Sequence, residues 1–119
     1  MSDDPVWILD EIELQPGRLA EFRAAFEADY LPGAKERGME LVHALATPPV
    51  ELAEGGTRLV VVWRVASVAD FWAMRARNSA PEVAGFWRDT AALYVSRTRR
   101  YAAEVDALDR LDAASRANA

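Results

Sequence analysis

Two polar residues interrupt apolar strand patterns and are the first candidates for chemistry. Residues 6–14 alternate between two faces, and Asp10 lies on the face that is otherwise apolar. His43, the only histidine, is predicted to share one face of a second strand with Leu41 and Leu45. A carboxylate or an imidazole can take up or deliver a proton near neutral pH, so both are candidate catalytic residues.

A buried carboxylate at Asp10 needs a partner, because an unpaired one costs several kcal/mol, roughly, or takes up a proton. Arg97 in the last predicted strand is the expected partner, and a structural ion pair is the alternative to catalysis. His43 has a similar alternative as a hydrogen-bonded core or interface residue. If Asp10 and His43 share a face, they flank a strand at about 10 Å, so a ligand could bridge them.

Large aromatic side chains are the candidates for binding a substrate. Tyr30, Trp63, Trp72 and Trp87 supply surface suited to a flat apolar molecule, and Arg97 could meet an anionic group on it. The alternative is that these rings fill the interface between helices and sheet, as aromatic residues at helical spacing usually do.

Composition excludes several other classes of function. The chain has no cysteine and one histidine, and its carboxylates show no metal-ligand spacing, so neither a metal nor another cofactor is expected. The net charge of -5 gives no overall attraction for nucleic acid. No apolar run approaches a membrane span and the amino terminus lacks the pattern of a signal peptide, so we expect a cytoplasmic protein.

The elements that must position these residues follow from periodicity and turn signals. Pro16-Gly17 ends the first strand, Pro32-Gly33 is expected to end the first helix, and Ser67 with Asp70 predicts the cap of the second. The order strand, helix, strand, strand, helix, strand predicts an α+β, ferredoxin-like antiparallel sheet with its helices on one side. Strands are expected over residues 6–14, 39–47, 58–65 and 94–101, and helices over 19–31, from 68 to about 77, and again after 81.

Residues 1–101 are expected to form one domain, and 102–119 a short helical tail. The strands offer apolar residues on both faces, whereas the helices can cover only one. A homodimer that buries the second face is therefore expected.

Three segments resemble NIPSNAP-type domains of the dimeric α/β barrel superfamily: residues 14–22 (LQPGRLAEF), 30–32 (YLP) and 60–67 (VVVWRVAS). The resemblance spans about residues 6–101. It implies a dimeric α/β barrel and a superfamily that includes cofactor-independent monooxygenases, isomerases, polyketide cyclases, haem proteins and members without assigned activity. Val61 stands where that family has a histidine, so no role of that histidine carries over.

Three hypotheses follow for the function. The first is a cofactor-independent enzyme acting on a small apolar, aromatic or polyketide-like molecule, with Asp10 or His43 moving a proton. The second is a non-catalytic NIPSNAP-like module for ligand binding or assembly, favoured by the lack of a strong catalytic motif. The third is haem binding through His43, since one axial histidine suffices.

Overall fold

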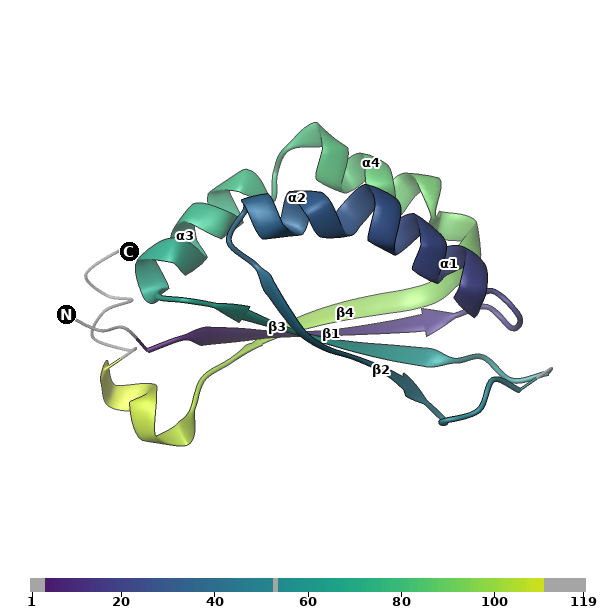
Figure 1. Ribbon diagram of the computed structural model, residues 1–119, viewed down its shortest axis with the longest axis horizontal. Coiled ribbons are helices and arrows are strands. Elements are labelled where there is room, and N and C mark those ends of the chain that lie inside the picture. Colours follow the sequence, from purple (N-terminus) through teal and green to yellow (C-terminus); the bar gives the residue numbers. More distant parts are fainter. Residues whose placement is uncertain (1–3, 53, 111–119) are drawn as a thin grey trace.

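The computed structural model describes residues 4–52 and 54–110, and the predicted order of elements is confirmed (Figure 1). The strands are β1 (Val6–Leu14), β2 (Glu40–Thr47), β3 (Arg58–Val65) and β4 (Tyr94–Ala102). The helices are α1 (Leu19–Ala25), a π-helical turn η1 (Phe26–Tyr30), α2 (Leu31–Glu36), α3 (Val68–Arg77) and α4 (Pro81–Asp89), with short 3₁₀ turns η2 (Ala91–Leu93) and η3 (Val105–Ala107).

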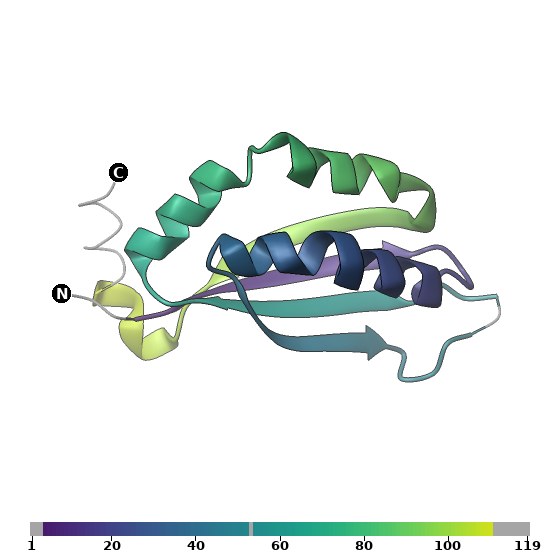
Figure 2. The same cartoon turned by 45° about the horizontal axis from the view of Figure 1, so that its top comes forward.

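The four strands form one antiparallel sheet in the order β2-β3-β1-β4. Helices α1 to α4 all lie on one face of it, as Figures 1 and 2 show. The alternation predicted for β1 is confirmed, because every second residue from Val6 to Leu14 is buried beneath the helices. This is the ferredoxin-like fold of class α+β.

The core lies between the sheet and the helices. Trp63 of β3 and Phe22 of α1 are fully buried there with Ile8 and Ile12 of β1. Phe26, Phe86 and Trp87 pack their rings around Phe22 at centroid distances of 6.1 to 6.3 Å. Many of the large rings therefore stabilise the helix-sheet interface.

The first helical segment is longer than predicted. Pro32-Gly33 was expected to end it, but α1, η1 and α2 follow one another without a break to Glu36. Pro32 lies in the first turn of α2, directly after the π-helical turn, and the first turn is the part of a helix in which proline is best tolerated. The helical segment ends instead at Glu36, and Gly38, just beyond it, has a φ of 91°, which suits a residue without a Cβ.

An irregularity in β2 changes which side chains face the helices. Leu41 pairs with Trp63 of β3 and His43 pairs with Val62, so Val42 between them is the extra residue of a β-bulge. The prediction that Leu41 and His43 share a face is therefore wrong. Downstream of the bulge, Ala44 faces the helices and His43 faces the opposite side of the sheet.

The second half of the chain follows the prediction closely. The Ser67 hydroxyl accepts a hydrogen bond from the Asp70 backbone N–H at 3.1 Å and caps α3. After β4 the chain turns through η3, where Ala107 is buried against the core cluster. The tail was predicted over residues 102–119; the structure places Ala102 at the end of β4, and residues 111–119 lie outside the described residues.

Candidate functional site

The buried carboxylate of Asp10 lies at the centre of a partly buried hydrogen-bond network. It accepts two hydrogen bonds from Arg99, at 2.7 Å from Nε and 2.9 Å from Nη2, and a third from Trp63 Nε1 at 2.9 Å. The predicted pairing with Arg97 is wrong. Arg97 and Arg99 share the helix-facing side of β4, but Asp10 lies directly opposite Arg99, and Arg97 lies opposite Ile12.

Arg99 stays charged in this network. Burial alone would lower the pKa of Arg99, but hydrogen bonding and attraction to Asp10, aided by Tyr30, outweigh burial and raise it. Arg99 Nη2 also donates to the Tyr30 hydroxyl at 3.1 Å. With both oxygens of Asp10 occupied, a proton-transfer role for this carboxylate would require the network to open.

The structure brings together three of the predicted site residues, namely Asp10, Tyr30 and Trp63. His43 is exposed on the other face of the sheet, so the expectation that it could share a ligand with Asp10 is wrong. Trp72 lies near the surface with Arg75 over its ring. The remaining two form a separate stack, with the guanidinium of Arg97 over the ring of Trp87 at 4.2 Å.

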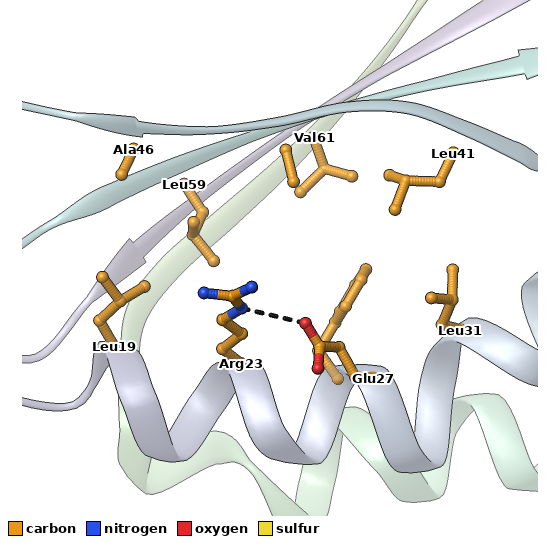
Figure 3. Close-up of a pocket in the computed structure, with 10 residues that line it drawn as sticks. Leu19, Arg23, Glu27, Leu31, Leu41, Ala46, Leu59 and Val61 are labelled. Atoms are coloured by element: carbon orange, nitrogen blue, oxygen red, sulfur yellow. Dashed lines mark hydrogen bonds and ion pairs between the residues drawn. The ribbon is translucent and has the colours of Figure 1, made fainter. Parts of the chain in front are cut away.

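A hollow of about 550 Å³ lies elsewhere, between strands β2 and β3 and the helical segment α1–η1 (Figure 3). Its size is typical of small-molecule sites. None of the predicted site residues lines it. The lining residues are Leu19, Arg23, Phe26, Glu27, Leu31, Leu41, Ala44, Ala46, Leu59 and Val61.

The hollow exists because small side chains face the helix at the edge of the sheet. The bulge at Val42 directs Ala44 and Ala46 of β2 toward α1, and each side chain ends at Cβ. Sequence reasoning missed these residues because two alanines in a strand carry no chemical signal. Phe26 and Val61 separate the hollow from the network: Phe26 packs on Trp63, and Val61 lies opposite Asp10.

Two charged residues stand among the apolar lining. Arg23 of α1 and Glu27 of η1 lie one helical turn apart, and Arg23 Nε donates to Glu27 Oε1 at 3.0 Å. Both side chains are more than half exposed. Among the described residues they are the only ionisable groups that line the hollow.

The site does not fit the haem hypothesis. The lining contains no histidine, cysteine, tyrosine or methionine that could ligate haem iron, and His43 is directed away from it. Residues 4–52 and 54–110 contain no group of three histidine, cysteine or acidic residues placed to hold a metal ion. None of the helices described there is long and apolar enough to cross a membrane.

No family model matches the sequence, and no curated protein matches it either. Solved structures do match it. An uncharacterized NIPSNAP-like domain protein from Burkholderia xenovorans has a TM-score of 0.68 and 18% identity, over 87% of this chain and 88% of that one.

Two further matches have the same fold. A NIPSNAP family protein of unknown function from Agrobacterium tumefaciens has a TM-score of 0.67 and 16% identity, over 87% of this chain and 91% of that one. A candidate antibiotic biosynthesis monooxygenase from Nitrosomonas europaea has a TM-score of 0.64 and 11% identity, over 88% of this chain and 94% of that one. At the level of the fold, the resemblance to NIPSNAP-type domains is confirmed.

Proposed function

We propose that this protein binds a small, largely apolar molecule in the hollow between α1–η1 and strands β2 and β3. The observation that carries the proposal is a space of about 550 Å³ with eight apolar residues among its ten lining residues. Such a space suits an apolar body, because binding removes apolar surface of both ligand and protein from water.

The functional unit we propose is a homodimer joined through the sheet face opposite the helices. Leu9 of β1 and Val62 of β3 lie opposite each other on that face and remain only half-buried in the single chain. Leu45 of β2 is 53% exposed on the same side. Burying these side chains against a second copy would stabilise both chains.

A second candidate function is cofactor-independent chemistry on the bound molecule, such as oxygenation, isomerisation or cyclisation. It is favoured by the similarity in fold to a candidate antibiotic biosynthesis monooxygenase from Nitrosomonas europaea. Neither of the predicted catalytic residues, Asp10 and His43, lines the hollow, so neither is placed to act on a molecule bound there. Binding without turnover is therefore the better-supported function.

The test is a titration with neutral aromatic probes, naphthalene-2-methanol and 2-acetylnaphthalene, followed by NMR shifts of the methyl groups of Ala44, Ala46 and Leu59. We expect saturable binding with a Kd below about 1 mM. Ala44→Leu should obstruct the space and abolish binding while leaving the protein folded.

The matched control is Ala24→Leu, because Ala24 is exposed on α1 and does not line the hollow. This variant should bind like the wild type. Oxygen uptake with 1-naphthol, present in the wild type and lost in Ala44→Leu, would favour the enzymatic candidate. Shifts that avoid the hollow, or binding that survives Ala44→Leu, would overturn the proposed site.

A further inference from the structure

We propose that the ligand carries an acidic group, such as a carboxylate, which the guanidinium of Arg23 binds at the mouth of the hollow. This inference rests on the proposed function, since it names the chemical class of the molecule bound there. It assigns to Arg23 the role of a specificity-determining residue.

The hydrogen bonding of Arg23 leaves both Nη groups of its guanidinium available. Glu27 accepts only from Nε of Arg23, and neither Nη donates to any residue that the structure describes. A guanidinium presents two edges, each able to hold a carboxylate through two parallel N–H···O bonds. Glu27 occupies the side edge, and the end edge formed by the two Nη groups is open.

The direction of the open edge matters as much as its donors. Figure 3 shows the terminal nitrogens of Arg23 held over the hollow toward Leu59, whereas the second oxygen of Glu27 points back toward its own helix. We expect an acid to place its apolar body among Leu41, Leu59 and Val61. Its acidic group would then contact the guanidinium of Arg23 before it came near the carboxylate of Glu27. The geometry thus selects an acid rather than an amine.

The ion pair with Glu27 prepares the arginine for this role. An arginine side chain loses rotamer entropy when it is held by a ligand, and a neighbouring acceptor at Nε reduces that loss beforehand. Because the pair is exposed, we expect a modest preference for acids, about tenfold in Kd, which corresponds to about 1.4 kcal/mol.

Three probes of matched shape test the inference: 2-naphthoic acid, naphthalene-2-methanol and naphthalene-2-methylamine. In calorimetric titrations of the wild type we expect the acid to bind about tenfold more tightly than the alcohol, and the amine more weakly than either. Arg23→Gln should make the acid and the alcohol bind equally. Glu27→Gln should strengthen binding of the acid, because it removes a competing negative charge while the amide oxygen can still accept from Nε.

Arg18→Gln is the control, since Arg18, the residue before α1, also forms an exposed ion pair, with Glu21 of α1 at 2.7 Å, but does not line the hollow. It should keep the preference for the acid. Equal binding of acid and alcohol, with both abolished by Ala44→Leu, would overturn the inference and leave the proposed function standing. A preference that persists in Arg23→Gln would also overturn it. Failure of all three probes to bind would overturn both.

Discussion

At the scale of single residues, the central feature is the carboxylate of Asp10, which receives three hydrogen bonds in an otherwise apolar layer. A buried ion pair of this kind contributes little net stability compared with apolar packing. Losing one partner is a different matter, because it leaves the other charge buried and unpaired. Measuring the free energy of unfolding of an Asp10 variant therefore tests whether this residue has a structural role.

We predict that Asp10→Asn lowers the free energy of unfolding by about 3 kcal/mol, because Arg99 would keep its charge without a counterion. Urea denaturation followed by circular dichroism measures this. Glu21→Gln, which removes the exposed partner of Arg18, should change stability by less than about 0.5 kcal/mol. Equal effects of the two substitutions would contradict a structural role for Asp10.

The pH dependence of this pair has a definite sign. The pKa of Arg99 is raised in the folded state, so its stabilising contribution is fully present below the usual pKa of arginine and is lost only as pH rises through the higher folded value. We therefore expect Arg99 to contribute no change in stability between pH 6 and pH 9. Comparing, across this range, urea midpoints of the wild type with those of a variant that carries both Asp10→Asn and Arg99→Met measures it, because this variant leaves neither charge unpaired and the difference should stay constant.

The sequence allowed Asp10 to be recognised as a buried charge that needs an arginine, but it did not identify which arginine. Arg97 and Arg99 share one face of β4, and periodicity fixes the face of a residue without fixing the register between strands. The register places Arg99 opposite Asp10. Arg97 packs on Trp87 instead, where its stem and ring form a separate contact.

At the scale of elements, the junction between the loop before β3 and the end of β1 leaves no room for a side chain. A Cβ on Gly56 would lie 2.6 Å from the carbonyl oxygen of Leu14, and the adjacent Leu14 N–H donates to the Thr57 carbonyl at 2.8 Å. Because the obstructing atom belongs to the backbone, the strands themselves would have to move apart. Close approach of two backbones is a common reason for glycine.

We predict that Gly56→Ala destabilises the protein by about 1 to 3 kcal/mol, as other overpacking substitutions do. Gly55→Ala is the control, since its Cβ would meet only the flexible side chain of Leu52 at 3.3 Å. The control should stay within about 0.5 kcal/mol of the wild type. Thermal unfolding of both variants gives the comparison, and equal melting temperatures would contradict the predicted contact.

The order of the elements was predictable because their periodicity and turn residues agree with one another. The exceptions were local. Pro32-Gly33 is a sequence typical of a turn, but the helical segment continues through it after the π-helical turn. The bulge at Val42 could not be predicted, because an extra apolar residue in an apolar strand has no distinctive sequence pattern. The hollow was not predictable because it depends on what Ala44 and Ala46 face, which the bulge decides.

At the scale of the whole molecule, the proposed dimer makes a direct prediction. Val62→Glu places a charge at the centre of the open sheet face, opposite Leu9 and beside His43, and should convert the dimer to a monomer. Sedimentation equilibrium at roughly 50 µM measures the mass. Val50→Glu, at a loop position that is 65% exposed, should leave the dimer intact. A wild-type monomer at this concentration would remove the dimer proposal.

The bulge at Val42 also determines how the length of β2 can change. Val42 lies outside the pairing between β2 and β3, so deleting it would leave Leu41 opposite Trp63 and His43 opposite Val62. Removing one residue further along the strand would instead exchange the side chains of the two faces, because side chains in a strand alternate. The alanines of the hollow would then face outward. Val42 is thus the position at which this strand could tolerate the loss of a residue over evolution without losing its cavity.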